Sequence, residues 1–138
     1  MRSDYRRKDK ACMIGLEDAK KVSKFSLEGI VVRAMVTKVY DGDTVHAVFA
    51  SEEGGQYHRW SCRLLGVNTP ELRTSDPQEK LLATRARDAL SERILGKEVR
   101  LHVGKFEKYG RLLVTIYLGE ENLNEWLVRE GHAVDYLV

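Results

Sequence analysis

The spacing of apolar residues changes several times along the chain, and each change predicts a different element. Apolar and β-branched residues dominate five short segments, which predicts strands over 30–40, 44–50, 56–67, 97–103 and 111–118. Between the third and fourth strands, apolar residues recur at helical spacing up to about Leu95, and Gly96 is a stop signal. A second helix is expected to begin at Asn122, with Glu125 completing a capping pattern, and to end at Gly131.

The longer helix has its own start signals. Ser75 or Asp76 is expected as its N-cap, followed by Pro77 at the first helical position. Its apolar face is expected to consist of Leu82, Ala86, Ala89, Leu90 and either Arg93 or Ile94. A short helix is also expected within 13–22, where apolar residues have roughly helical spacing.

The order of these elements is three strands, a helix, two strands and a helix, which is the plan of an OB-fold barrel. Alternation alone does not separate this plan from other α+β arrangements. We expect an α+β fold with a five-stranded OB-fold-type β-barrel and two or three helices. It would occupy residues 29–138 of the 138-residue chain, and residues 1–28 would form an N-terminal basic extension.

Charge is unevenly distributed. Residues 1–29 hold eight Lys and Arg against five Asp and Glu, whereas residues 30–138 hold fifteen against sixteen. The body of the protein is therefore nearly neutral, and its bulk charge does not by itself indicate nucleic acid. If phosphate is bound, individual arginines and lysines must bind it.

Several classes of protein are disfavoured. No apolar run approaches the ~18 residues that a membrane span needs, so no membrane association is expected. The charged N-terminus lacks the pattern of a signal peptide, so we expect an intracellular or phage-encoded protein, or a trimmed secreted one. Cys12 and Cys62 lack metal-site spacing, so we expect free thiols and no zinc. A monomer is the default expectation.

Two segments carry acidic groups that could take part in chemistry. Asp41-Gly42-Asp43 is typical of a tight hairpin turn with positive φ angles, but it also places carboxylates at a strand end, where they could bind a hard cation. Further on, Pro70 stiffens the loop before Glu71. Glu71 is either a solvated loop residue or a general base that activates water.

Two arginines could bind phosphate. Arg63 precedes the stiff loop, and an arginine in a strand is commonly ion-paired. Arg111 ends the run Glu107-Lys108-Tyr109-Gly110-Arg111, which is either an ordinary charged loop or a phosphate site. A guanidinium offers a planar fork of donors to phosphate oxygens, while Lys108 adds charge and Tyr109 adds a hydroxyl and a ring face.

Together these motifs resemble the thermonuclease (staphylococcal nuclease) family. The residues that carry the resemblance are DGDT at 41–44, RLLGVNTPE at 63–71, KYGR at 108–111 and the later pattern NExLVxxG. The resemblance spans about residues 34–136. It implies an OB-type barrel and calcium-dependent hydrolysis of DNA and RNA, leaving 3′-phosphorylated ends, with single-stranded substrates preferred.

The resemblance also implies a role for each site residue. For the metal, Asp43 corresponds to the first calcium ligand, Thr69 to a residue that lends its backbone carbonyl, and Asp41 to an acidic neighbour. For catalysis, Glu71 corresponds to the carboxylate that activates the attacking water, and Arg63 and Arg111 to the arginines on the scissile phosphate. For the substrate, Lys108 and Tyr109 correspond to residues that contact a terminal phosphate.

One position departs from the family pattern. Asn68 stands where the family has Asp, so this ligand position keeps an oxygen but loses a charge, and we expect weaker or differently selective metal binding. The departure leaves a second hypothesis open, a catalytically weak or inactive nucleic-acid-binding OB module. In that case Tyr40, Tyr57 and Trp60 could stack on bases, although core packing is the commoner role of such residues.

Overall fold

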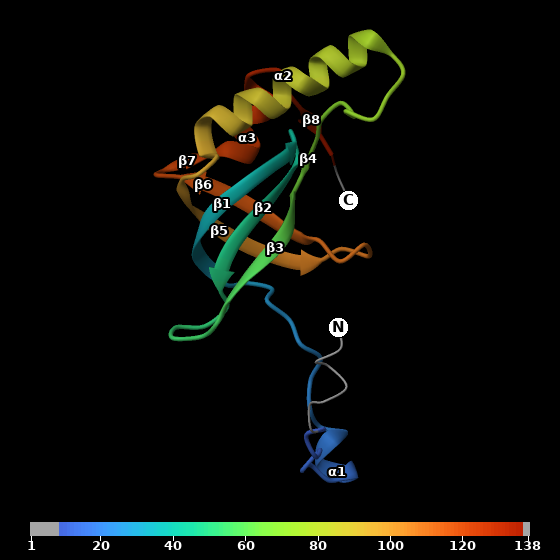
Figure 1. Ribbon diagram of the computed structural model, residues 1–138, viewed down its shortest axis with the longest axis vertical. Helices are drawn as coiled ribbons and strands as arrows, with labels where there is room; N and C mark the ends of the chain where they lie inside the picture. Colours follow the sequence, from blue (N-terminus) through green and yellow to red (C-terminus); the bar gives the residue numbers. More distant parts are fainter. Residues whose placement is uncertain (1–8, 137–138) are drawn as a thin grey trace.

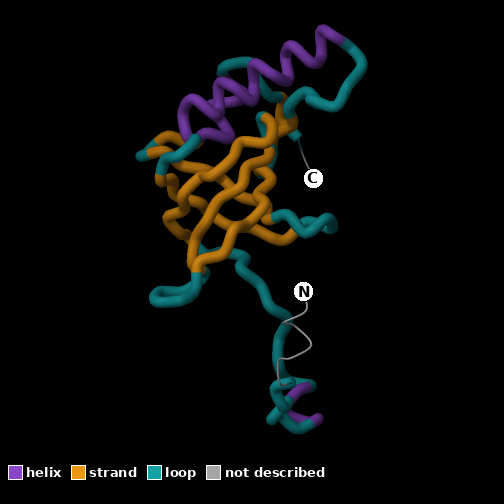
Figure 2. Tube along the Cα trace, in the orientation of Figure 1, coloured by secondary structure: helices purple, strands orange, loops and turns teal. Residues whose placement is uncertain are grey.

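The computed structural model describes residues 9–136 and contains a closed five-stranded barrel (Figures 1 and 2). Residues 1–8 of the predicted extension and 137–138 of the predicted domain lie outside this range. The barrel strands are β1 (Val31–Asp41), β2 (Thr44–Ala50), β3 (Tyr57–Leu64), β5 (Glu98–Phe106) and β6 (Leu112–Leu118). They pair in the order β3-β2-β1-β5-β6, and a parallel pairing of β3 with β6 closes the barrel. The predicted α+β barrel is therefore confirmed.

Three helices and three short strands complete the described chain. The helices are α1 (Leu16–Ala19), α2 (Pro77–Ile94) and α3 (Leu123–Arg129). The two-residue strands are β4 (Val67–Asn68), β7 (Glu121–Asn122) and β8 (Val134–Asp135), and β4 pairs with β8 apart from the barrel. Figure 1 shows α2 lying across one end of the barrel, while α1 lies beyond the other end. Every residue from 9 to 26 is exposed, and Leu27 is the first that packs into the core.

Alternation of side chains builds the core. In β2 and β3, inward residues such as Val45, Phe49 and Cys62 are almost fully buried, and their neighbours face outward. Cys12 and Cys62 are free thiols, as expected. Burial raises the pKa of the Cys62 thiol to about 12, which keeps it neutral and apolar in character.

Helix α2 starts and stops where the sequence indicates. Asp76 is its N-cap and accepts a hydrogen bond from the Gln78 N–H, and Gly96 beyond its end has φ +73°. The buried face is Ala83, Ala86, Leu90 and Ile94. Leu82 was predicted to belong to this face, but it is 46% exposed. The prediction was wrong by one residue because Ala83, not Leu82, lies in phase with Ala86 and Leu90.

A buried asparagine ties α3 to the barrel. The Asn124 Oδ1 accepts a hydrogen bond from Ile116 N–H at 3.0 Å. Its Nδ2 donates to Leu65 O at 2.9 Å and Val114 O at 3.0 Å. These bonds join α3 to the backbone of β6 at Val114 and Ile116 and to Leu65, the residue that follows β3. The chain just after Arg63 is thereby held in place.

Two other expectations were wrong in detail. Strand β5 continues to Phe106, three residues beyond its predicted end at 103. The third predicted strand ends at Leu64, because Gly66 turns the chain with φ +80°.

The β1–β2 turn does not need glycine for the predicted reason. Gly42 is absent from the described residues that have positive φ. A Cβ at this position would lie 2.8 Å from Thr69 Cγ2 and 2.9 Å from Ala86 Cβ. Glycine is therefore required by the close approach of the turn to the 68–71 loop and α2.

We predict that Gly42→Ala destabilises the fold by about 1–3 kcal/mol, because the added methyl must displace α2 or the Thr69 side chain. Urea unfolding measures the loss. Gly15→Ala is the control, since no atom lies within 4 Å of a Cβ there. Equal stability of Gly42→Ala and the wild type would show that the turn can move away from the helix.

Candidate active site

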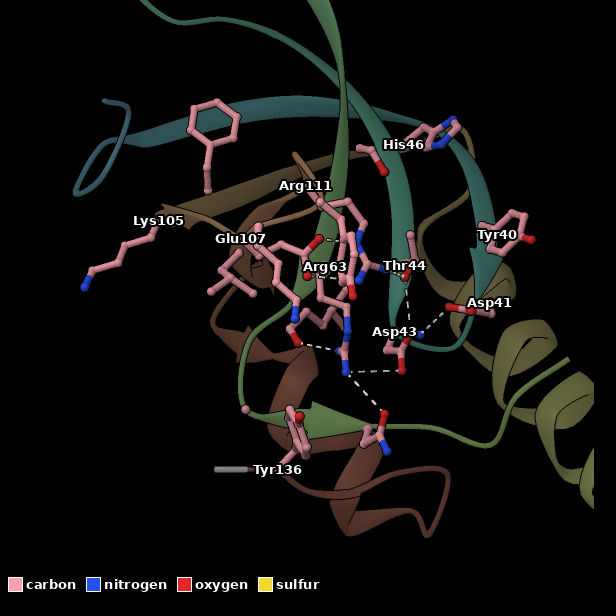
Figure 3. Close-up of a pocket in the computed structure, with 18 of the residues that line it drawn as sticks. Tyr40, Asp41, Asp43, Thr44, His46, Arg63, Lys105, Glu107, Arg111 and Tyr136 are labelled. Carbon is pink, nitrogen blue, oxygen red and sulfur yellow. Dashed lines mark hydrogen bonds and ion pairs between the residues drawn. The ribbon is translucent and has the colours of Figure 1, made fainter. Parts of the chain in front are cut away.

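A cleft of about 960 Å³ lies where the β1–β2 turn, the segment after β3 and the β5–β6 loop meet (Figure 3). It brings together all but one of the residues predicted for the site, namely Asp41, Asp43, Arg63, Asn68, Glu71, Lys108, Tyr109 and Arg111. Thr69 lies behind the cleft, and it lines an adjoining groove with Pro70. Residues that are distant in sequence thus converge at one opening.

Asp43 is the most enclosed acidic group of the cleft, at 7% exposure. Its Oδ2 accepts a hydrogen bond from Thr69 N–H at 3.1 Å, and its Oδ1 accepts one from Thr44 Oγ1 at 3.2 Å. Its backbone carbonyl accepts from Leu64 N–H at 2.8 Å. The 64–69 segment therefore wraps around this one residue and fixes the orientation of its carboxylate.

Two carboxyl groups share the turn. Asp41 Oδ1 accepts a hydrogen bond from the Asp43 N–H at 3.1 Å. Burial, a side-chain hydrogen bond with Asp43 and the negative charge of Asp43 raise the pKa of Asp41 to about 7, and they outweigh this backbone bond, which lowers the pKa. Burial also acts to raise the pKa of Asp43, but the hydrogen bond with Asp41, the charge of Arg63 and the Thr69 N–H outweigh it and lower this pKa. Near neutral pH, Asp43 is therefore charged and Asp41 is partly protonated.

Arg63 is held from several sides. Its Nη1 donates to Leu64 O and Val67 O, both at 2.8 Å, and its Nη2 donates to Asn68 Oδ1 at 3.2 Å. Nη2 also lies 3.6 Å from Asp43 Oδ2, and the guanidinium carbon lies 5.9 Å from the centre of the Tyr136 ring. The guanidinium is fixed beside the carboxylate at the wall of the cleft.

Arg111 is held by a different set of groups. Its Nε and Nη2 donate to the two carboxylate oxygens of Glu107 at 2.8 and 3.0 Å, and its Nη1 donates to Thr44 Oγ1 at 3.3 Å. These hydrogen bonds lower the pKa of Glu107, so this carboxylate stays charged near neutral pH. Arg111 is thereby aimed across the cleft toward the acidic turn.

Sequence reasoning missed the roles of Glu107 and Thr44. Thr44 Oγ1 donates to Asp43 and accepts from Arg111, so it connects the acidic turn to the second arginine. Thr44 is also the register partner of Arg63 on the neighbouring strand. The opposite charges four residues apart, Glu107 and Arg111, were the visible signal for the first of these contacts.

The remaining predicted residues line the rim. Glu71 is exposed, and its backbone N–H points to Glu79 Oε2 at 3.4 Å. Tyr109 is 73% exposed, and the Lys108 Nζ lies 5.1 Å from the centre of its ring. Tyr136, which the sequence analysis did not assign to the site, also lines the cleft. The side chains of Glu71 and Tyr109 are therefore accessible to a ligand.

The chemistry of these donors fits a hard divalent cation. The carboxylates of Asp41 and Asp43 and the amide oxygen of Asn68 are oxygen donors, and a bound cation would favour the charged form of Asp41. Within residues 9–136, however, no three His, Cys, Asp or Glu side chains are grouped closely enough to form a protein-only metal cage. The set therefore fits a cation that keeps several water ligands.

Comparison with known proteins agrees with this geometry. Residues 61–138 match the family described as staphylococcal nuclease homologue. The chain belongs to the staphylococcal nuclease family. The matched segment contains both arginines and Glu71, whereas the acidic turn at 41–43 precedes it.

Individual relatives support the same family. The chain is 35% identical to a thermonuclease of Staphylococcus hyicus over 100 residues, which cover 71% of this chain and 56% of that protein. It is 33% identical to a thermonuclease of Staphylococcus intermedius over 101 residues, covering 72% and 56%. A probable staphylococcal-like nuclease of Oryza sativa subsp. japonica is 26% identical over 118 residues, covering 77% and 30%.

The matches cover only part of the length of these relatives. The chain spans about half the length of the curated thermonucleases that it matches, 56% in each case. In the part that the structure describes, no helix is both long and apolar enough to cross a membrane.

The two arginines should differ in their contribution to stability. We predict that Arg63→Met lowers the free energy of unfolding by about 2–3 kcal/mol, because Leu64 O, Val67 O and the buried Asp43 carboxylate all lose a donor. Arg111→Met should cost less than half as much, because solvent can reach Glu107 and Thr44 once the cleft is vacated. Denaturant unfolding of both variants checks this, and equal losses would contradict it.

Proposed function

We propose that this staphylococcal nuclease family member hydrolyses phosphodiester bonds of DNA and RNA with calcium, and that its products carry 3′-phosphates. The observation that carries the proposal is the pairing, across one cleft, of two fixed arginines with the Asp41–Asp43 turn. Thr44 joins the two halves through hydrogen bonds of 3.2 and 3.3 Å. A protein that only binds nucleic acid would not need both arginines and the acidic turn to be held in fixed positions.

Arg63 and Arg111 are proposed to bind the scissile phosphate. Negative charge builds up on the non-bridging oxygens during hydrolysis, and cations placed there beforehand stabilise it without reorganisation. Internal acceptors already hold both guanidinium groups in place. Each arginine would exchange part of these contacts for phosphate oxygens.

Glu71 is proposed as the general base. It stands exposed at the rim of the cleft, where water can reach it, and no positively charged group is bonded to its carboxylate among the described residues. It would accept a proton from water while the water oxygen attacks phosphorus. The bond from phosphorus to the 5′-oxygen breaks, which leaves the phosphate on the 3′ side.

The metal site is proposed to consist of Asp43, Asn68 and the backbone carbonyl of Thr69, with Asp41 beside it. Calcium would supply additional positive charge for the phosphate oxygens. The fixed carboxylate of Asp43 is the strongest part of this assignment, because Thr69 N–H, Thr44 Oγ1 and Arg63 all contact it.

Lys108 and Tyr109 are proposed to contact a terminal phosphate of the substrate from the rim. Their exposure and the openness of the rim suit a single strand, so single-stranded DNA and RNA are the proposed preferred substrates. We also propose that residues 29–138 act as a monomeric catalytic domain and that residues 1–28 are an extension. The burial that begins at Leu27 supports this boundary.

Cleavage of single-stranded DNA in the presence of calcium, with a chelator as control, tests the proposal. Arg63→Lys, Glu71→Gln and Arg111→Lys should each lower the rate by about 10²–10³, because each variant loses a donor or base aimed at the reacting phosphate. Arg100→Gln is the matched control, since this exposed arginine lies on β5 outside the cleft. Cleavage that persists in chelator would contradict the metal dependence.

A second candidate function is nucleic-acid binding with little or no catalysis. One contact favours it, since the Asn68 side-chain oxygen already accepts a hydrogen bond from Arg63. A neutral residue so engaged is a poorer metal ligand than a carboxylate.

Asn68→Asp distinguishes the two functions. We predict that this variant binds calcium more tightly in isothermal titration calorimetry and cleaves DNA faster, because it restores a ligand charge. Asn68→Ala is the control, and it should bind calcium no better than the wild type. Unchanged calcium affinity in Asn68→Asp would remove position 68 from the metal site. Absent turnover in both the wild type and this variant would favour the binding function.

A further inference from the structure

The cleft does not end at the two arginines. Its lining continues along the outer face of β1, β2 and β3 to Tyr40, His46 and Ser61. In the view of Figure 3, Tyr40 and His46 lie on one side of the arginine pair and Lys105 lies on the other. None of the catalytic or metal-binding roles proposed above uses this part of the cleft.

Strand register connects this extension to the site. Thr44 pairs with Arg63, and two residues further along β2, His46 pairs with Ser61 on one side and Lys38 on the other. Residues two apart on a strand face the same side and are about 7 Å apart. His46 therefore stands one step along the same face from the arginine that would bind the scissile phosphate.

Positively charged side chains lie around His46. The Lys38 Nζ lies 5.5 Å from the centre of the Tyr40 ring. Lys38 is the register partner of His46 on β1, and Arg59 lies two residues before its partner Ser61 on the same face of β3. Burial, and then the charges of these two residues, lower the pKa of His46. Neither Lys38 nor Arg59 forms an ion pair with another residue of 9–136. Their charges are available to an anionic ligand.

We propose that Tyr40, Lys38, His46 and Arg59 form a second nucleotide subsite, called here the outer-face subsite. A base stacks on Tyr40, and the adjoining phosphate is bound by Lys38 and Arg59, with His46 between them. The proposal rests on the proposed nuclease function and extends it from a single scissile bond to a strand that runs along the barrel.

The chemistry of the subsite selects an unpaired strand. Tyr40 is 45% exposed, so its ring can contact a ligand. An aromatic ring stacks on the face of a base only when the base is free of its own neighbours, as it is in single-stranded DNA or RNA. The rim residues Lys108 and Tyr109 lie on the β5–β6 loop, so the two sets would bind different nucleotides of one strand.

Two substrates distinguish an effect on the subsite from an effect on the reaction centre. One is the p-nitrophenyl diester of a single nucleoside phosphate, which is too short to reach both places. The other is a short single-stranded DNA. In Tyr40→Leu and in Lys38→Gln, we expect the ratio of kcat/KM for the DNA to kcat/KM for the diester to fall about tenfold, mainly through KM.

Strands β5 and β6 supply matched controls. Arg100 lies over the Tyr117 ring at 5.3 Å, much as Lys38 lies over Tyr40, but Tyr40 lines the cleft and Tyr117 does not. Arg100→Gln and Tyr117→Leu should leave the ratio within about twofold of the wild type. A fall in these controls equal to that in Lys38→Gln and Tyr40→Leu would overturn the proposal.

Equilibrium binding provides a readout without turnover. Fluorescence anisotropy with labelled single-stranded DNA in chelator measures affinity against salt. Lys38→Gln should reduce the slope of log K against log salt by about 0.7, as expected for the loss of one phosphate contact to a single strand. Tyr40→Leu should weaken binding about tenfold and leave the slope unchanged.

The outcomes keep the two proposals apart. If the wild type cleaves neither substrate, the nuclease function fails, and the anisotropy series still decides the subsite. If the wild type cleaves both substrates but the ratio, the affinity and the salt slope are the same in Lys38→Gln and Tyr40→Leu, the outer-face subsite is overturned. Binding of duplex DNA as tight as that of single strands would also overturn it.

Discussion

The carboxylate of Asp43 is the group on which the cleft depends. It is almost fully enclosed, and a buried charge is stable only when hydrogen bonds and opposite charge surround it. Thr69 N–H, Thr44 Oγ1 and Arg63 meet that requirement from three different segments of the chain. The contacts that stabilise the Asp43 carboxylate therefore bring the β1–β2 turn, the end of β3 and the 68–71 loop to the same point.

Closure of the barrel makes this convergence possible. The parallel pairing of β3 with β6 sets Arg63 beside Leu113, and Arg111 directly precedes β6. Both arginines thus reach the cleft from adjacent strands, and Asn124 of α3 bonds Val114 within β6 and Leu65 just after β3. Because internal acceptors orient the guanidinium groups before any ligand arrives, little reorganisation would be needed to stabilise charge on a phosphate.

The same cleft combines tightly held and exposed groups. The acidic turn and the arginines are held by several short contacts each, whereas Glu71, Lys108 and Tyr109 stand exposed on loops. Fixed groups suit charge stabilisation, and exposed ones can contact a strand that enters from solvent. The cations along the outer face of β1–β3 continue this arrangement beyond the reacting bond.

The sequence by itself determined the order of the elements, the caps at Asp76 and Asn122 and the residues that gather in the cleft. These features follow from hydrophobic periodicity and short motifs, and each such signal lies within a single stretch of the chain. Only the tertiary structure decided why Gly42 must be glycine, which leucine faces solvent, how Glu107 and Thr44 hold Arg111, and that Asn68 contacts Arg63. Each of these features depends on a contact with a residue distant in sequence or on the direction of a side chain. Local sequence patterns specify neither.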